Sequence, residues 1–268
     1  MQDILTCAMG LDIHRDVIVA CLAKGELGTD PEIEIRSFST LIPEMRKLRD
    51  WVLEAECRYV AMESTGIYWQ PIYEMLEPCF DGQISILVVN ARHMKNVPGR
   101  KTDMRDAQWI ATLLRAGLLK GSFIPDKTFR ELRHLTRYRK SIVRDITAQK
   151  NRIDKFLQSS GFRFTAFLSD AFGASGRNII RHLMEYGNIS REALDRCLKT
   201  QTRKRIDEIL IALNGSLSEH QRGFLRMIFG HLEALEQHRH TVEDAITKEI
   251  TKHEEALSLL CSIPGIDV

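Results

Sequence analysis

Four acidic residues stand at positions from which their side chains could bind divalent metal ions. Asp12 and Glu63 each follow a short apolar segment, and Asp103 and Asp106 lie three residues apart in KTDMRDAQWIATLL. Residues three apart in a helix share one face. Two-metal phosphodiester chemistry needs several convergent carboxylates, and Mg²⁺ or Mn²⁺ prefers oxygen ligands of this kind. These four acids are therefore our candidate catalytic and metal-binding residues.

Each of these acids also has a simpler interpretation. Thr102 is a favourable helix N-cap, and carboxylates in the first turn of a helix interact well with its dipole. Capping alone could therefore explain Asp103 and Asp106. An acid that follows a strand, such as Asp12, is often a turn residue. Asp16 competes with Asp12 as the first acid of the set, but a β-turn position suits Asp16 better.

Basic residues are concentrated in the middle of the chain. Residues 90–163 contain eighteen Lys and Arg and six Asp and Glu, a surplus of +12 within a net charge of +2, so the remainder carries −10. Such a segment is expected to meet a polyanion, although exposed helix faces are also rich in Lys and Arg. We predict that nucleic-acid phosphates contact Arg92, Lys95, Arg100, Lys101, Arg105, Arg130, Arg133, Arg137, Arg139, Lys140 and Arg144.

The first part of the chain alternates between the patterns of strands and helices. Strands are predicted at 6–13, 17–22, 32–38, 58–62 and 84–89, and helices from Pro43 to Leu53, at 66–76 and at 102–119. Three antiparallel strands followed by two parallel strands with helical crossovers make an α/β fold of the RNase H type. In that fold Asp12 and Glu63 end neighbouring central strands.

Beyond Pro125 the pattern becomes helical. Residues 127–159 lack Gly and Pro and carry apolar residues at helical spacing. Residues 161–187 are rich in Gly and Phe and are predicted to connect helices, a further helix is predicted at 191–213, and a long one at 218–260. Long helices of this kind pack against each other or against a second copy of the chain. We divide the chain into residues 1–125, 126–258 and 259–268.

Several functional classes are disfavoured by the sequence. No apolar run approaches the roughly eighteen residues of a membrane span. The first residues become charged too early for a secretory signal, and the six cysteines form no CxxC pair, so reduced thiols in the cytoplasm are expected. Ser64 has no neighbouring His to act as its base. An ATP-using relative of actin would need a Gly-rich hairpin after Asp12, which the sequence does not contain.

Four segments together resemble a known family: GLDIHRD (10–16), AMESTGIYW (61–69), VVNARHMKNVPGRKTDMRDAQWIATLLRAGLL (88–119) and LLCSIPGI (259–266). They are similar to the DEDD transposases of insertion-sequence family one-ten, which include the pilin-gene invertases. The resemblance implies that Asp12, Glu63, Asp103 and Asp106 are the four acids of a RuvC-like, divalent-metal-dependent domain. It also implies a coiled-coil region after Pro125 that assembles dimers or tetramers.

The resemblance further implies DNA as substrate and a structured bridge RNA as guide, in a bacterial cytoplasm beside the nucleoid. In the family, a second domain begins near the PGI motif and supplies a serine that attacks DNA. Here that motif is Pro264-Gly265-Ile266, so we expect 259–268 to be the start of that domain and the attacking serine to lie outside this sequence.

Three functional hypotheses remain open from the sequence. The leading one is a DNA transposase or site-specific recombinase, represented by its RuvC-like and helical parts. The second is a stand-alone nuclease of the junction-resolving type, which would use the same acids and need no further domain. The third is a non-enzymatic nucleic-acid-binding or regulatory fragment, whose binding would be unaffected in kind by replacing Glu63 with alanine.

Overall fold

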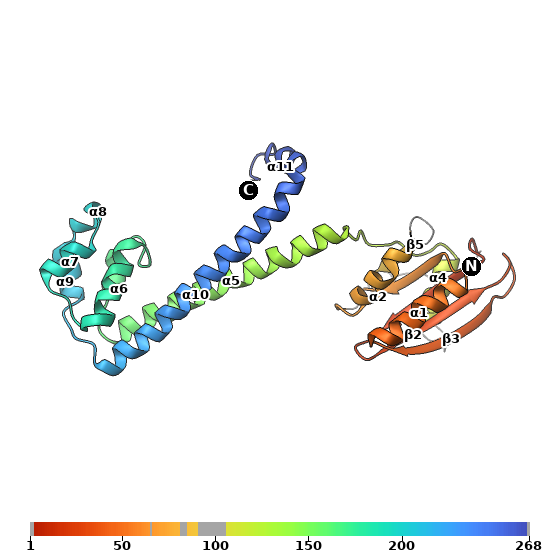
Figure 1. The fold of residues 1–268 in the computed structure, drawn as a ribbon, viewed down its shortest axis with the longest axis horizontal. Helices are drawn as coiled ribbons and strands as arrows, with labels where there is room; N and C mark the ends of the chain where they lie inside the picture. Colours follow the sequence, from red (N-terminus) through yellow and green to blue (C-terminus); the bar gives the residue numbers. More distant parts are fainter. Residues whose placement is uncertain (1–2, 65, 81–84, 91–105, 267–268) are drawn as a thin grey trace. The chain divides into compact units, whose positions relative to one another are not determined.

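The computed structural model describes residues 3–64, 66–80, 85–90 and 106–266, which form two compact units (Figure 1). Unit 1 is Met1–Ile124 and unit 2 is Pro125–Val268. Each unit has its own hydrophobic core, so each is described separately. No helix within the described ranges is long and apolar enough to cross a membrane.

Unit 1 is built on one mixed five-stranded sheet with the strand order β3-β2-β1-β4-β5. β1 (Cys7–Ile13), β2 (Val17–Lys24) and β3 (Glu32–Ser39) form an antiparallel meander, and β4 (Tyr59–Glu63) and β5 (Ser85–Val89) run parallel to β1. This order and these directions confirm the predicted RNase H-like fold.

Large apolar side chains cover one face of this sheet. Met9, Leu11 and Ile13, which alternate along β1, share a core with Leu48 and Trp51 of helix α1. Helices α1 (Ile42–Glu54) and α2 (Trp69–Leu76), followed by the short η1 (Glu77–Phe80), provide this layer. The sequence favours helix α1 because Pro43 stands in its first turn and its buried residues recur at helical spacing.

The opposite face carries small residues and a single described helix, α4 (Asp106–Arg115). Ala8 of β1 and Ala61 of β4 contact Ile110 and Leu114, and Ala107 and Ala111 complete the layer over β2. The helix ends in Arg115, which is buried at 1% exposure. Its guanidinium donates to the carbonyl oxygens of Leu5, Gly25 and Glu26 at 3.0, 3.2 and 2.7 Å and pairs with Asp3 at 3.1 Å.

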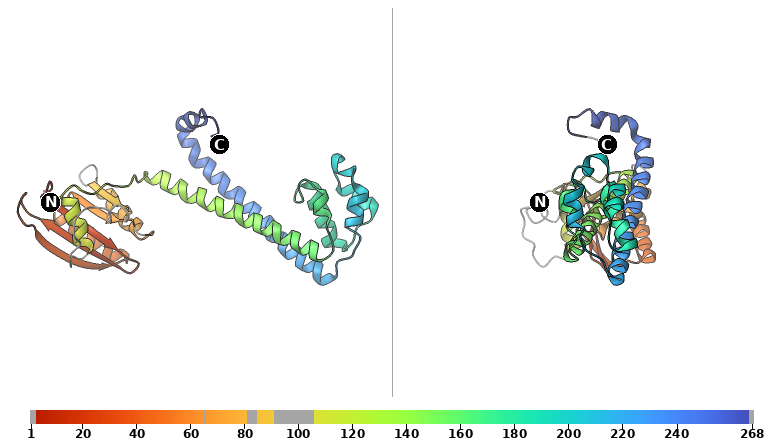
Figure 2. Two further views of the ribbon diagram at one scale, coloured as in Figure 1. Left: turned by 180° about the vertical axis from the view of Figure 1, so that it is seen from behind. Right: turned by 90° about the vertical axis from the view of Figure 1, so that its left-hand side faces the viewer.

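Two long helices lie side by side in unit 2 (Figures 1 and 2). They are α5 (Lys127–Ser159) and α10 (Glu219–Ile250). Asp126 caps the first by accepting from Phe129 N at 3.1 Å, and Ser218 with Gln221 forms a capping box on the second. The helices run antiparallel, since Arg139 meets Glu243 whereas Gln149 donates to the carbonyl oxygen of Ile228. The long helices therefore pack against each other within one chain.

The segment between the long helices differs from the sequence prediction. The segment predicted to be a connection, 161–187, contains η2 (Phe164–Phe167) and helix α6 (Ala174–Tyr186). The single helix predicted at 191–213 is three short ones, α7 (Arg191–Cys197), α8 (Thr200–Arg203) and α9 (Ile206–Ala212). The long helix predicted to reach 260 is interrupted at η3 (Thr251–His253) before α11 (Glu254–Cys261).

The interruption after α7 has a visible cause. Leu198 leaves the helix with extended backbone angles and is 4% exposed in the core of unit 2. The next residue, Lys199, donates its backbone N–H to the Ser175 hydroxyl of α6 at 3.0 Å. Burial of a leucine and a tertiary hydrogen bond thus replace the helical hydrogen bonds that local periodicity favours.

Candidate acidic site

Asp12 and Glu63 lie at the same end of two adjacent parallel strands. Leu11 of β1 is in register with Met62 of β4, and Asp12 and Glu63 are the residues that follow each of them. Side chains alternate between the faces of a strand. Asp12 shares its face with Ala8 and Glu63 shares its face with Ala61, both of which contact α4. Both carboxylates therefore project from the α4 face of the sheet.

Helix α4 brings a third acid to this end of the sheet. Gly10 of β1 lies on the α4 face, and a Cβ added there would be 2.2 Å from the Ala107 carbonyl oxygen and 2.4 Å from the Ala111 nitrogen. The helix backbone thus rests directly on β1, two residues before Asp12. Asp106 is the first residue of α4, immediately before Ala107. The fourth predicted acid, Asp103, lies outside the described residues.

Asp12 has a close polar neighbour that the sequence pattern did not reveal. His14 Nε2 is 3.1 Å from Asp12 Oδ2, with side-chain exposures of 59% and 17%. His14 follows Asp12 by two residues at the β1–β2 turn, where His14 N donates to Val17 O at 2.9 Å. That spacing was the sequence signal from which the contact could have been predicted. Asp16, in contrast, is 74% exposed and pairs with Arg15 at 2.9 Å, in keeping with a turn role.

The described acids fit a hard divalent cation in donor chemistry. Asp12, Glu63 and Asp106 supply carboxylate oxygens, the ligands that Mg²⁺ and Mn²⁺ prefer. Among the residues that the structure describes, however, no group of three or more His, Cys, Asp or Glu side chains is close enough together to hold an ion. This finding concerns the described side chains alone and does not include Asp103.

Residues 9–161 match the sequence model of the IS110-type DEDD transposases, which is described as a transposase. The chain belongs to this family. None of the curated proteins compared with the chain matches it.

Two solved structures are similar to parts of this IS110-family transposase. Thermus thermophilus RuvC has 12% identity and a TM-score of 0.30 over 43% of this chain and 99% of RuvC. T. thermophilus RuvC in complex with a Holliday junction substrate has 13% identity and a TM-score of 0.27, over 44% of this chain and 100% of RuvC. The fold assignment of the transposase rests on its own strand order and register.

The basic residues predicted to contact phosphate fall into two groups. Arg92, Lys95, Arg100, Lys101 and Arg105 lie outside the described residues. The other six are on α5. Arg130 is partly buried and donates to the Pro125 carbonyl oxygen at 2.8 Å, and Arg139 pairs with Glu243 of α10 at 2.7 Å. These two arginines have contacts within unit 2.

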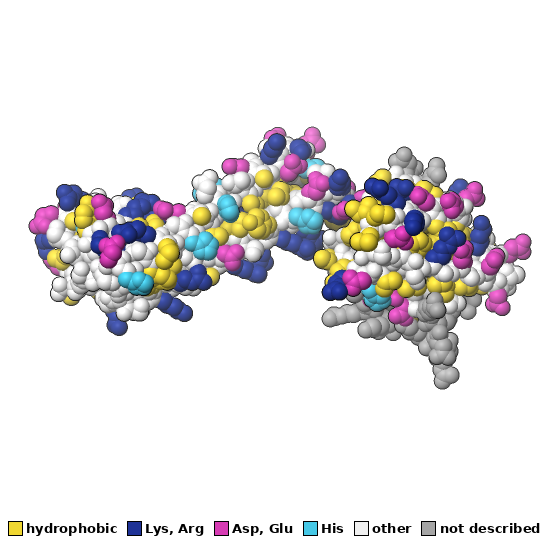
Figure 3. Space-filling view, turned by 60° about the horizontal axis from the view of Figure 1, so that its bottom comes forward, with side chains coloured by type: hydrophobic (Ala, Val, Ile, Leu, Met, Phe, Trp, Pro, Cys, Tyr) yellow, Lys and Arg dark blue, Asp and Glu magenta, His cyan; other side chains and the backbone are white. Residues whose placement is uncertain are grey.

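The remaining four basic residues of α5 form an exposed stripe. Arg133, Arg137, Lys140 and Arg144 are all exposed, and their spacings of four, three and four residues place them on one face of the helix. Figure 3 shows Lys and Arg side chains gathered along one edge of the long helices. In this transposase the stripe is a row of exposed positive charges along one face of α5.

Proposed function

We propose that this transposase is a DNA recombinase whose Asp12, Glu63, Asp103 and Asp106 bind Mg²⁺ or Mn²⁺ and orient a scissile phosphodiester. The observation that supports this most directly is the parallel register of β1 and β4. It sets two carboxylates at the same end and on the same face of the sheet, where α4 begins with Asp106. Family membership supplies the DNA substrate class.

The acids would bind the metal ion, and the sheet and α4 would position them. A bound divalent ion would polarise the phosphate and stabilise the charge that develops on its oxygens. The strand ends would hold the carboxylates of Asp12 and Glu63 at a fixed separation, and the backbone contact at Gly10 would hold Asp106 beside them. We propose that the hydroxyl that attacks DNA belongs to a serine of the family's second domain.

Nucleic-acid binding would be carried by the basic stripe on α5, defined by Arg133, Arg137, Lys140 and Arg144, together with the basic residues before α4. We propose that the stripe binds DNA, or a structured guide RNA that pairs with donor and target DNA. Self-association as a dimer or tetramer through the long helices would bring two such sites to one recombination event.

The acidic site is tested first by metal binding, which does not depend on a complete reaction. Mn²⁺ binding to the purified chain is measured by electron paramagnetic resonance for the parent and for Asp12→Asn and Asp106→Asn. We expect each variant to weaken Mn²⁺ binding about tenfold or more, because each removes a charged oxygen ligand. Asp16→Asn is the matched control, since Asp16 is an exposed acid of the adjacent turn. Equal binding by all four proteins would contradict the proposal.

Activity then separates the proposed recombinase from a junction-resolving nuclease. The chain is incubated with Mg²⁺ and labelled duplex, four-way junction and single-stranded DNA, with and without its co-purifying RNA. Junction cleavage that disappears in both variants would favour the nuclease. Binding without cleavage, together with strand exchange once a longer chain is supplied, would favour the recombinase. If the chain binds DNA or RNA but no Mn²⁺, only the non-enzymatic alternative would remain.

The basic stripe is tested through the salt dependence of binding. Replacing its four residues with Gln should lower the log–log salt slope by roughly 3 to 4 units, because each phosphate contact contributes about 0.9. A control with two paired arginines of unit 2, Arg181→Gln and Arg191→Gln, should leave the slope unchanged. A quadruple variant with the parental slope would place the phosphate contacts elsewhere.

A further inference from the structure

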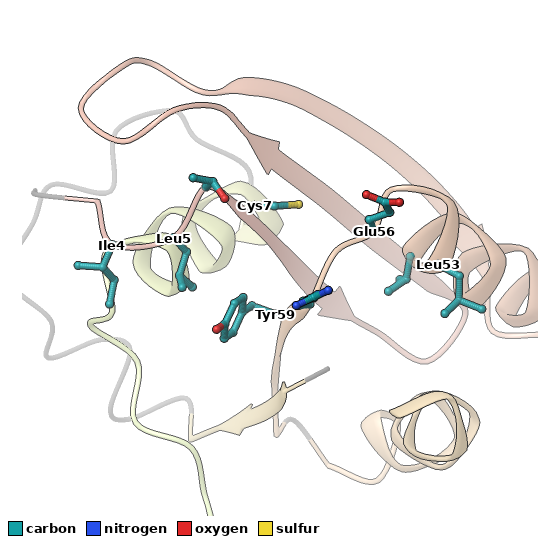
Figure 4. Close-up of a pocket in the computed structure, with 9 residues that line it drawn as sticks. Ile4, Leu5, Cys7, Leu53, Glu56 and Tyr59 are labelled. Atoms are coloured by element: carbon teal, nitrogen blue, oxygen red, sulfur yellow. The ribbon is translucent and has the colours of Figure 1, made fainter. Parts of the chain in front are cut away.

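A cleft of about 700 Å³ opens in unit 1 at the end of β1 remote from Asp12. The residues that line it come from the segment that leads into β1 and from the stretch between the end of α1 and the start of β4 (Figure 4). Cys7, at the start of β1, forms part of its wall, and its sulfur atom points toward the segment that carries Glu56. A small polar molecule can therefore reach the Cys7 thiol from solvent.

A second thiol lies behind Cys7. Cys57 is fully buried beside β4; its Sγ donates to the Tyr59 carbonyl oxygen at 3.2 Å, and its side chain also lies within hydrogen-bonding reach of Cys7. Met9 is in register with Val60, and extending this register by two residues puts Cys7 opposite Arg58, next to Cys57. Both cysteines belong to the apolar core on the α1 side, and an inter-strand spacing of about 4.8 Å is compatible with the Cα separation of roughly 4.4 to 6.8 Å that a disulfide needs. Both cysteines are free thiols.

The turn after α1 fixes the position of Cys57. Cys57 N donates to the Val52 carbonyl oxygen at 3.2 Å and Glu56 N to the Leu53 carbonyl oxygen at 3.0 Å, the two hydrogen bonds of a Schellman motif. Glu56 occupies the left-handed position of this motif with φ of 52°. The motif ends the helix abruptly and directs Cys57 into the core instead of into solvent.

The environment gives the two thiols different acidities. The hydrogen bond from Cys57 lowers the pKa of Cys7 to about 7; burial opposes this shift, and Lys24, the cross-strand partner of Cys7, supports it. The same hydrogen bond, followed by burial, raises the pKa of Cys57. The charged side chains that line the cleft are Glu56 and Arg58. The accessible thiol is therefore the more acidic of the two, and the buried thiol behind it is the less acidic.

We propose that Cys7 and Cys57 form an oxidisable dithiol, in which a peroxide that enters the cleft converts the pair to an intrachain disulfide. The Cys7 thiolate attacks one oxygen of hydrogen peroxide, forms a sulfenic acid and releases hydroxide. The Cys57 sulfur then attacks the Cys7 sulfur, its proton joins the departing hydroxyl group, and water leaves as the S–S bond forms. The two electrons lost by the thiols reduce the peroxide, and a thiol reductant reverses the change.

The disulfide would join β1 to the turn that follows α1. It lies on the α1 side of the sheet and at the opposite end of β1 from Asp12. Transient disulfides in reducing compartments are typically catalytic or redox-sensing. This modification site of unit 1 is therefore separate from the acidic site.

The experiment treats the intact chain with hydrogen peroxide, blocks the remaining thiols with iodoacetamide and maps the peptides by mass spectrometry. We expect a Cys7–Cys57 cross-linked peptide that disappears on addition of dithiothreitol. Iodoacetamide labelling of Cys7 in the untreated chain should follow a thiolate midpoint near pH 7, about ten times faster at neutral pH than an ordinary thiol. Cys21 is the internal control, because burial raises its pKa to about 11.

Two variants make the test independent of any single substitution. In Cys57→Ser the Cys7 sulfenic acid should accumulate and react with dimedone, whereas in Cys7→Ser peroxide should leave Cys57 unmodified. Circular dichroism checks that both variants fold, and the cross-link in the parent chain decides the matter if either does not. Parent chain without the cross-link, or with Cys7 over-oxidised and Cys57 still free, would overturn the proposal.

Discussion

The two faces of the unit 1 sheet are packed against their helices in different ways. The face under α1 and α2 buries large side chains such as Met9, Leu11 and Trp51, which fill the space between sheet and helices. The face under α4 has Gly10, Ala8 and similar small residues, and helix and strand backbones touch. Large side chains bury much apolar area and tolerate repacking, whereas a backbone contact leaves no room for adjustment.

This difference places the candidate site on the face that adjusts least. Carboxylates that share a metal ion must be held in position to within a fraction of an ångström. Asp12 follows Gly10 by two residues and Asp106 directly precedes Ala107, so the backbone contact at Gly10 relates the two elements that carry these acids. Packing on the α1 face can stabilise unit 1 without setting the positions of the acids. Substitutions on the two faces test whether stability and metal binding can be separated in this way.

Gly10→Ala should have the largest effect. Its Cβ would overlap the Ala107 carbonyl oxygen at 2.2 Å, and a helix backbone cannot rotate away as a side chain can. We expect the free energy of unfolding to fall by about 4 kcal/mol in total, which is more than overpacking usually costs. We also expect the variant to lose Mn²⁺ binding. Urea unfolding followed by tryptophan fluorescence reports on unit 1 alone, because Trp51, Trp69 and Trp109 all lie within it.

Gly121→Ala is the matched control for that change. A Cβ at Gly121 would lie 3.4 Å from the Leu87 side chain, an ordinary contact, so stability should stay within about 0.5 kcal/mol. If Gly10→Ala were as mild as Gly121→Ala, the backbone contact would not be what positions α4.

Leu48→Ala probes the other face. Leu48 is fully buried in α1, and its truncation should cost about 3 kcal/mol through lost burial and the cavity left behind. The same fluorescence measurement gives the stability. Mn²⁺ affinity of the folded protein should remain within about twofold, since no atom of the α4 face moves. A parallel loss of metal binding would show that the two faces are not independent.

Sequence patterns predicted unit 1 well because each of its strands carries its own signal. The run ISILVV and the alternation at 32–38 are local features, and the acids at the strand ends followed from the fold order. The contact between Gly10 and Ala107 is different, since these residues are far apart in sequence and neither is unusual alone. The proximity of Cys7 and Cys57 was missed for the same reason, whereas His14 and Asp12 are only two residues apart and their contact depends on the geometry of the β1–β2 turn.

In unit 2 the patterns failed where tertiary packing overrides them. The many Gly and Phe residues of 161–187 led us to predict a connection, yet Gly176 lies inside α6, where a Cβ would be 1.9 Å from the Ala171 carbonyl oxygen. That glycine serves close packing instead of a turn. The opposite error occurred at 191–213, where regular spacing concealed a break caused by the burial of Leu198.

Arg115→Met examines how α4 is held at its far end. The change keeps most of the apolar stem but leaves Asp3 and four carbonyl oxygens, those of Leu5, Gly25, Glu26 and Thr29, without their donor, so we expect a loss of about 2 kcal/mol. Asp3→Asn should cost less, about 0.5 kcal/mol, because the carbonyl contacts survive. Equal effects of the two variants would mean that the ion pair, and not the carbonyl contacts, holds the arginine in place.

Glu56→Gly should give the smallest effect and the opposite sign. Glu56 has φ of 52° at the left-handed position of the Schellman motif after α1, where a residue with a Cβ is strained. Glycine removes the strain but adds freedom to the unfolded chain, so the net gain should be about 0.5 kcal/mol. Fluorescence-monitored urea unfolding measures it, with the exposed Glu54→Gly of the preceding helix as a control that should lose stability. A gain at Glu56 with unchanged Mn²⁺ affinity would confine the effect to the α1 face, whereas a change in Mn²⁺ affinity would connect the end of α1 to the acids across the sheet.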